Sequence, residues 1–288
     1  MTDHSDCGSC NDTSCSAKSQ NPQENDEAFQ ARQRLENRLC KIDQRILVMS
    51  GKGGVGKSTM AVSLALALAK EGKRVGLLDI DLHGPSLPTM LGLNEQQIFS
   101  NDEGIVPLEF EGIKVMSIGF MIQDVGQAMI MRGPMKHGAI QQFLADVNWG
   151  ELDCLVVDCP PGTGDEPLSA AQLLGNGAAA VVVTTPQDVA LVDVEKSISF
   201  CNELNLNLLG IVENMSGFSC PHCGEVSDIF KSGGGEELSA KRSVPFLGKI
   251  PLDSRMVLSG DSGKPFILEH PDSEAAQALM NVARKIIR

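Results

Sequence analysis

The sequence has 288 residues, which is long enough for a substantial core, and its formal net charge is −13. This acidic balance argues against non-specific DNA binding, which needs Lys and Arg to displace counterions, and against attraction to anionic lipid. We therefore expect neither nucleic acid nor a membrane among the partners. The polar N-terminus (MTDHSDCGSC) does not resemble a signal peptide, and nine cysteines, an odd number, fit reduced thiols in the cytoplasm.

The chain is predicted to divide into a tail, a short helix and one larger domain. Residues 1–26 are rich in Ser, Asn, Asp and Gln, which predicts a disordered, cysteine-containing tail. Residues 27–40 have helical periodicity and predict a lead-in helix. From residue 41 to residue 288 apolar strands alternate with helices and no second linker interrupts them, so we expect a single domain.

The strands and helices of this domain alternate along the chain. Apolar stretches predict strands at residues 46–49, 75–79, 113–118, 154–158, 179–184, 208–213 and 246–250. Helices are predicted at residues 57–70, 134–147, 166–174, 190–204, 235–241 and 273–287. Several strands are continuous apolar runs, as in strands buried on both faces of a parallel sheet. The pattern predicts an α/β fold with a doubly wound, mostly parallel sheet.

A glycine-rich segment, GKGGVGKST at residues 51–59, lies between the first strand and its helix. It matches the phosphate-loop pattern G-x-x-x-x-G-K-S/T in the required strand–loop–helix context. Its glycines let backbone N–H groups point at phosphate oxygens, and the helix adds its positive end. The residues expected to bind the nucleotide are Gly51, Lys52, Gly53, Gly54, Val55, Gly56, Lys57, Ser58 and Thr59. Lys57 is expected on the β- and γ-phosphates, and the Ser58 hydroxyl on Mg²⁺.

Lys52 narrows the class of this loop. A lysine directly after the first glycine resembles the signature lysine of the deviant-Walker P-loop ATPases, which include the MinD/ParA, nitrogenase iron protein, arsenical-pump and Mrp families. The resemblance implies that Lys52 contacts the nucleotide of a partner subunit across a dimer interface. A solvated surface lysine is the alternative interpretation.

Carboxylates follow two further strands, at the edge where ligands of open α/β sheets bind. Asp79 and Asp81 point to the same side of an extended chain. Asp81 resembles the switch carboxylate that orients the attacking water, and Asp79 is expected in the Mg²⁺ shell, with a loop-capping role as the alternative for one of them. Asp158 ends an apolar run of Walker-B type and is expected to hold Mg²⁺ through water. Lys52, Lys57 and Asp81 are thus the predicted catalytic residues of an ATPase.

Asn214 and Pro251 complete the predicted ATP site. Asn214 follows the strand at residues 208–213 and resembles the residue that reads adenine through its amide in this class, whereas a simple turn former is the alternative. Pro251 begins the tripeptide PLD and resembles a second wall of the adenine pocket. The expectation of ATP rather than GTP therefore depends on the resemblance.

Cys220 and Cys223 form a C-P-H-C pair, and thiolates at this spacing can hold one face of a metal ion or cluster. One pair is only half of a four-ligand site, and residues 224–288 contain no further cysteine. The missing ligands could come from a second copy across a two-fold axis or from the N-terminal cysteines. A redox dithiol is the third possibility.

Several motifs occur in an order that resembles the Mrp/ApbC iron–sulfur carrier ATPases. They are DIDLHGPS at 79–86, RGPM at 132–135, DCPPGTGD at 158–165, VENMS at 212–216 and CPHC at 220–223. The resemblance covers residues 41–288 and implies a homodimer in which Cys220 and Cys223 of each subunit bridge a labile [4Fe-4S] cluster. It further implies slow ATP hydrolysis, coupled to transfer of the cluster to apo-proteins. A MinD/ParA-like positioning ATPase and an ATP-driven iron–sulfur reductase are the alternatives.

The tail carries Cys7, Cys10 and Cys15. They partly resemble the four-cysteine N-terminal cluster motif of eukaryotic-type relatives, but one cysteine is missing. A second cluster in the tail and opportunistic metal binding by a disordered segment both stay open.

Overall fold

The computed structural model describes residues 20, 25–121, 131–220, 222–223 and 225–287. Most of the predicted tail lies outside the described residues, and Cys7, Cys10 and Cys15 lie there with it. The predicted lead-in helix at 27–40 is α1, which begins and ends one residue earlier (Asp26–Leu39) and which the Asn25 side chain caps through the Ala28 N–H. Within the described residues, no helix is long and apolar enough to cross a membrane.

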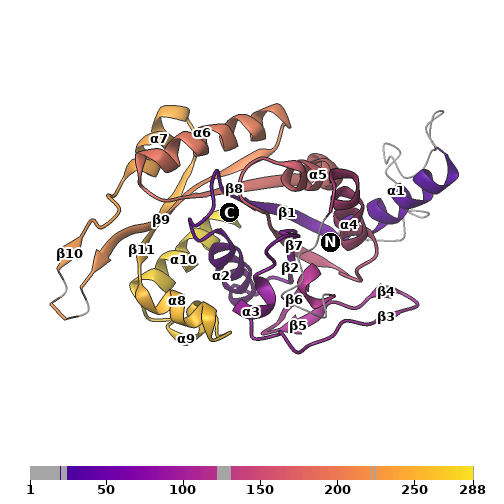
Figure 1. Ribbon diagram of the computed structural model, residues 1–288, viewed down its shortest axis with the longest axis horizontal. Helices are drawn as coiled ribbons and strands as arrows, with labels where there is room; N and C mark the ends of the chain where they lie inside the picture. The colour runs from indigo at the N-terminus through magenta and orange to yellow at the C-terminus, as the bar shows by residue number, and fades with distance from the viewer. Residues whose placement is uncertain (1–19, 21–24, 122–130, 221, 224, 288) are drawn as a thin grey trace.

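A nine-stranded sheet runs through the middle of the molecule (Figure 1). The strands of the described residues, two of which lie outside this sheet, are β1 (Ile42–Met49), β2 (Val75–Asp79), β3 (Ser100–Asn101), β4 (Gly104–Ile105), β5 (Leu108–Phe110), β6 (Ile113–Ser117), β7 (Leu152–Asp158), β8 (Ala178–Thr184), β9 (Asn207–Ser219), β10 (Val226–Ser227) and β11 (Phe246–Leu252). Their order in the sheet is β10-β9-β8-β1-β7-β2-β6-β5, with β11 also paired to β9. β5 pairs antiparallel with β6, and β10 pairs antiparallel with β9, whereas the other pairs in this sheet are parallel. β3 and β4 form a separate two-stranded sheet.

Helices cover both faces of the sheet, so the predicted doubly wound α/β fold is confirmed. The remaining helices are α2 (Lys57–Lys70), α3 (Leu87–Met90), α4 (Gly133–Ala145), α5 (Asp165–Leu174), α6 (Asp188–Glu203), α7 (Gly234–Arg242), α8 (Ser254–Asp261), α9 (Phe266–Glu269) and α10 (Glu274–Ile286), with 3₁₀ turns η2 (Ile118–Phe120) and η3 (Gly175–Gly177). One core joins the sheet to α2, α9 and α10, and a second joins it to α1, α4 and α5. A smaller core joins β8 and β9 to α6 and α7.

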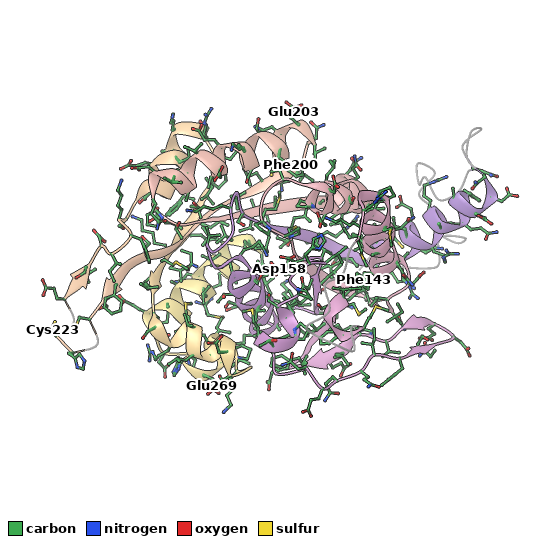
Figure 2. The ribbon with its side chains drawn as sticks, viewed as in Figure 1. Phe143, Asp158, Phe200, Glu203, Cys223 and Glu269 are labelled. Carbon is green, nitrogen blue, oxygen red and sulfur yellow. The ribbon has the colours of Figure 1, made fainter. Side chains whose placement is uncertain are left out.

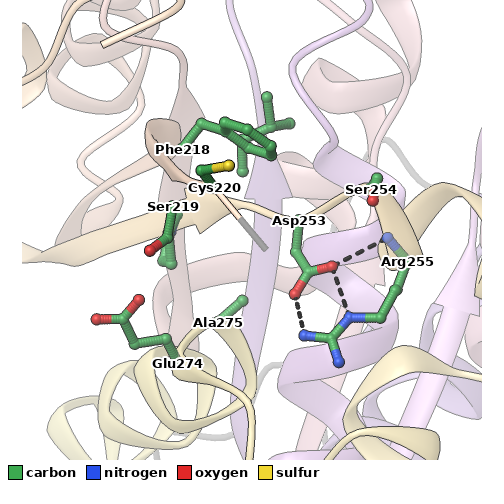
Figure 3. A pocket seen from close by; sticks show the side chains of 10 residues that line it. Phe218, Ser219, Cys220, Asp253, Ser254, Arg255, Glu274 and Ala275 are labelled. Carbon is green, nitrogen blue, oxygen red and sulfur yellow. Dashed lines mark hydrogen bonds and ion pairs between the residues drawn. The ribbon is translucent and has the colours of Figure 1, made fainter. Parts of the chain in front are cut away.

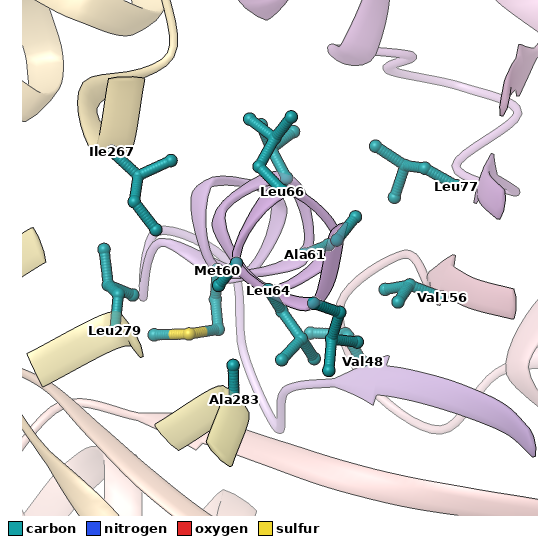
Figure 4. Packing of buried hydrophobic residues seen from close by; sticks show 14 of the residues in the cluster. Val48, Met60, Ala61, Leu64, Leu66, Leu77, Val156, Ile267, Leu279 and Ala283 are labelled. Atoms are coloured by element: carbon teal, nitrogen blue, oxygen red, sulfur yellow. The ribbon is translucent and has the colours of Figure 1, made fainter. Parts of the chain in front are cut away.

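Helix α2 is held from nearly every side, which fixes the loop in front of it. Met60 and Leu64 pack in one cluster with the strand residue Val48 and with Leu279 and Ala283 of α10 (Figure 4). Full burial of a side chain such as Leu contributes about 1.5–3 kcal/mol. Because α2 begins at Lys57, this packing anchors the carboxyl end of the phosphate loop.

Strand β9 is the largest departure from the predicted elements. The sequence predicts its end at residue 213, but the structure continues it to Ser219, so Asn214 lies within the strand and not after it. Met215 and Gly217 adopt left-handed φ values of 58° and 77° and bend the strand without ending it. The pairing with β11 shifts register between Ile250 and Leu252, opposite this bend. One strand therefore runs from the nucleotide loop to the C-P-H-C pair.

Candidate functional site

The phosphate loop connects β1 to α2 at the carboxyl edge of the sheet. Gly56 is the residue before the helix, with φ 82°, and among the described residues no side chain caps the first N–H groups of α2. Unpaired N–H groups at a helix N-terminus form a ready anion site. A Cβ on Gly56 would lie 2.3 Å from Nδ2 of Asn214, so only glycine fits there. The loop thus has the backbone shape that the sequence predicts for phosphate binding.

A buried ion pair joins the two predicted phosphate and Mg²⁺ residues. Lys57 Nζ lies 2.6 Å from Oδ1 of Asp158, and their side chains are 7% and 0% exposed. Burial raises the pKa of Asp158, although Lys57 opposes this effect. Oδ2 of Asp158 is buried and has no hydrogen-bond partner among the described residues. A buried carboxylate oxygen without a partner fits the role of binding a Mg²⁺-bound water.

Asp79 is fully buried beside Asp158 on the neighbouring strand. Its carboxylate accepts hydrogen bonds from the Asp81 N–H at 2.9 Å and from the Ser117 hydroxyl at 3.1 Å. Burial and, next, the charge of Asp158 raise the pKa of Asp79 to about 7. A place for Asp79 in the Mg²⁺ shell stays a prediction, because its observed contacts fix the loop that carries Asp81. Asp81 itself is partly exposed and accepts from the Gly84 N–H at 3.1 Å.

Lys52 is partly exposed, and no hydrogen bond or ion pair holds its side chain in the part of the chain that the structure describes. Next to it, Gly51 packs against α6, where a Cβ on Gly51 would lie 2.4 Å from the backbone carbon of Asp193. The loop is therefore fixed by its backbone, whereas the Lys52 ammonium is available for a ligand or a partner chain.

Asn214 contacts the phosphate loop directly. Its Nδ2 donates to the Val55 carbonyl at 2.8 Å, and the side chain is only 6% exposed. Recognition of adenine by the Asn214 amide stays a prediction, because the amide donates to Val55 within the chain.

Pro251 of β11 lines a cavity of about 460 Å³. Cys220 lines the same cavity, together with Asp253 and Arg255, which form an ion pair at 2.6 Å (Figure 3). Pro251, predicted to line the adenine pocket, and Cys220, predicted to bind the cluster, therefore line the same cavity.

Cys220 and Cys223 lie on the connection between β9 and β10, and Figure 2 shows Cys223 at the edge of the molecule. The Cys220 N–H donates to the Glu225 carbonyl at 2.9 Å and closes the turn. Backbone N–H groups of His222 and then Cys223 lower the pKa of the Cys220 thiol. A lowered pKa favours the thiolate, which is the form that binds metal. Among the described residues no group of three or more Cys, His, Asp or Glu is placed to hold a metal, so this part of the chain offers only a pair.

A charged cluster beside these loops was not predicted from the sequence. Glu166 is 7% exposed, and its Oε1 lies 2.7 Å from Nζ of Lys136 and 3.7 Å from Nε2 of His83. His83 follows Asp81, whereas Glu166 lies in the first turn of α5, which follows the loop after Asp158. The cluster therefore joins the loop that carries Asp81 to the helix that follows the Asp158 loop. The signal available in the sequence was that all three residues lie within or directly beside the quoted motifs.

Comparison with known proteins identifies the family. The model of the ParA family, described as NUBPL iron-transfer P-loop NTPase, matches residues 41–287. The cytosolic Fe-S cluster assembly factor NUBP2 of Rattus norvegicus is 49% identical over 254 residues, covering 86% of this chain and 94% of the relative. An iron-sulfur cluster carrier protein of Methanocaldococcus jannaschii is 44% identical over 281 residues, covering 97% and 96% of the two chains.

Solved structures agree with this family. The nucleotide-binding protein of Archaeoglobus fulgidus in complex with ADP is 42% identical, with a TM-score of 0.73, and the match covers 84% of this chain and 94% of that one. The cell division ATPase MinD of Pyrococcus furiosus, at 24% identity and a TM-score of 0.62 over 85% and 98% of the two chains, shows the shared fold. The predicted resemblance to iron–sulfur carrier ATPases is confirmed, and this chain belongs to the ParA family of iron-transfer P-loop NTPases.

Proposed function

We propose that this protein binds and slowly hydrolyses ATP and carries a [4Fe-4S] cluster that it passes to apo-proteins. The observation that carries this proposal is the position of Cys220 directly after β9, the strand that also contacts the phosphate loop through Asn214. The names of the relatives, a cytosolic assembly factor and a cluster carrier, support this activity and a cytoplasmic location. Neither nucleic acid nor a membrane enters the proposal.

The nucleotide half of the proposal follows from the loop geometry. We assign phosphate binding to the backbone N–H groups of residues 51–59 and to Lys57, which the nucleotide would draw away from Asp158. We assign orientation of the attacking water to Asp81, and the Mg²⁺ shell to Ser58 and Asp158. Bound Mg²⁺ would neutralise charge that develops on the phosphate oxygens.

The cluster half requires a second subunit. The described residues of one chain offer the pair Cys220 and Cys223, whereas a four-iron cluster takes about four cysteine ligands. A homodimer with the two pairs facing each other supplies this number, and it also places Lys52 to reach a partner's nucleotide. The cluster is the cargo of the protein, and the apo-proteins that receive it are the second kind of partner.

Iron and sulfide quantitation after anaerobic reconstitution tests the proposal. A variant that lacks residues 1–26 is expected to keep about two iron atoms per chain, which is one [4Fe-4S] cluster per dimer. Cys220→Ala in this background is expected to lose that iron, while Cys40→Ala, which removes an exposed thiol elsewhere, is expected to keep it. Full iron content in the Cys220→Ala protein would contradict the proposal.

A further inference from the structure

One buried carboxylate ties together both ends of the segment that carries the cysteine pair. Glu213 of β9 is 0% exposed, and its Oε1 accepts hydrogen bonds from the Ser216 hydroxyl at 2.5 Å and from the Gly233 N–H at 2.8 Å. Its Oε2 accepts from the Gly235 N–H at 2.5 Å. The cysteine hairpin is the antiparallel pair β9 and β10 with the connection that carries Cys220 and Cys223. Ser216 lies before this connection and Gly233 after it, so Glu213 closes the base of the hairpin.

The surrounding backbone is shaped to receive this carboxylate. A Cβ on Gly235 would lie 3.0 Å from Oε2 of Glu213, so a side chain there would push the carboxylate away. Gly233 has φ 91°, a left-handed conformation that favours glycine. The hydroxyls of Ser216 and Ser232 add a second tie across the base at 3.1 Å. Gly233 and Gly235, which follow the hairpin, therefore leave room for their N–H groups to bind the Glu213 carboxylate.

The next residue of the same strand reaches the phosphate loop. Asn214 donates to the Val55 carbonyl, and its amide fills the space where a Gly56 side chain would stand. Successive residues of a strand point to opposite faces, so Glu213 and Asn214 link the hairpin base and the phosphate loop from the two sides of β9. Met215 follows at φ 58°, a strained conformation for a non-glycine residue, and strain of this kind persists where the surrounding structure imposes it.

We propose that Glu213 is a positioning residue that couples nucleotide at the phosphate loop to the exposure of Cys220 and Cys223. When nucleotide binds, Val55 moves and shifts Asn214 through their hydrogen bond. The bend at Met215 moves with Asn214, and the hydrogen bonds of Glu213 to Ser216, Gly233 and Gly235 transmit this movement to the base of the cysteine hairpin, which changes the exposure of the thiols. Without these hydrogen bonds the base of the hairpin opens, and the thiols no longer respond to the phosphate loop. This inference rests on the proposed function, because it describes the control of the same cysteine pair.

Thiol alkylation of the metal-free, full-length protein tests the coupling without any cluster. The rate at which iodoacetamide modifies Cys220 is measured by mass spectrometry, with and without Mg²⁺ and a non-hydrolysable ATP analogue. Allosteric couplings typically change an equilibrium about fivefold or more, so we expect a rate ratio of about this size for the wild type. Glu213→Gln is expected to bring the ratio close to one while nucleotide affinity stays within about twofold of wild type, well below a typical coupling.

A matched variant separates this clamp from a general loss of charge. Glu236→Gln removes the same charge from α7, at an exposed carboxylate 2.8 Å from Lys249, and is expected to keep the wild-type ratio. Ser216→Ala removes only one donor to Glu213 and is expected to lower the ratio even if Glu213→Gln fails to fold. A wild type without nucleotide dependence, or a Glu213→Gln or Ser216→Ala protein with the full wild-type ratio, would overturn the coupling.

Iron content of the reconstituted wild type separates this inference from the proposed function. A wild type that holds no iron, but shows a nucleotide-dependent ratio that Glu213→Gln abolishes, rejects the carrier function and supports the coupling. A wild type that holds the bridging cluster with a ratio unaffected by Glu213→Gln rejects the coupling alone.

Discussion

Substitution of Gly56 by alanine tests how the phosphate loop depends on β9. Gly56 has φ 82°, and an added Cβ would lie 2.3 Å from Nδ2 of Asn214, which in turn donates to the Val55 carbonyl. The new methyl group must therefore displace the Asn214 amide and strain the backbone at the start of α2. Both effects act on the N–H groups that we expect to bind phosphate.

The size of the effect follows from these two contributions. A left-handed conformation costs an L-residue about 1–2 kcal/mol. Loss of the hydrogen bond between Asn214 and Val55 costs about 1 kcal/mol. Together they amount to about 2–3 kcal/mol, and since about 1.4 kcal/mol is a factor of ten, Gly56→Ala should weaken ATP binding roughly 30- to 150-fold.

Titration with a fluorescent ATP analogue measures this change, and Gly72→Ala is its matched control. Gly72 has φ 81°, but a Cβ there meets no described residue within 4 Å, so this substitution adds the same backbone strain far from the loop. We expect Gly72→Ala to bind ATP like the wild type, and Asn214→Ala added to Gly56→Ala to weaken binding little further, because Gly56→Ala already breaks the Asn214 hydrogen bond. If Gly56→Ala bound ATP as tightly as Gly72→Ala, the reasoning would be refuted.

Three further predictions concern charge and thiol chemistry. Lys136→Met leaves Glu166 buried without its ammonium partner and should lower the free energy of unfolding in urea by about 3 kcal/mol, and Glu166→Gln added to it should restore much of this loss. An unchanged urea midpoint for Lys136→Met would contradict the pairing. The pKa of Asp79 is raised from 3.8 to about 7 in the folded protein, so the folded state binds more protons than the unfolded state and the wild type loses stability as pH rises through this range. Asp79→Asn should therefore gain stability relative to the wild type between about pH 4 and pH 7, and a stability difference that stays constant with pH would contradict the raised pKa. Iodoacetamide should modify Cys220 and Cys223 before the three buried cysteines, in which burial raises the thiol pKa, and equal rates in peptide mapping would contradict this order.

The fold and the phosphate loop could be predicted from the sequence because their signals are local. The glycines of residues 51–59 and the apolar run of α2 determine conformation over a few turns, and the predicted bounds of α2 and β2 match the structure. The strand bounds fail where tertiary pairing overrides composition. β1 begins at Ile42, because its polar residues pair with β7, and β9 continues through Met215 because β11 pairs beside it.

The supporting contacts of the site were beyond the sequence because they join distant residues. Nothing local shows that Asn214 donates to Val55, 159 residues away, or that Lys136 pairs with Glu166. Glu213 stood within a quoted motif, yet its partners Gly233 and Gly235 become visible only when the hairpin is folded back. Long-range contacts of this kind decide how a motif is held, whereas the motif itself indicates the chemistry.

Native mass spectrometry of the anaerobically reconstituted protein tests the central claim most directly. The account predicts a species of two chains plus one [4Fe-4S] cluster, still formed when residues 1–26 are removed and absent from Cys220→Ala. A cluster bound to a single chain, or a cluster-bearing dimer of the Cys220→Ala protein, would contradict it.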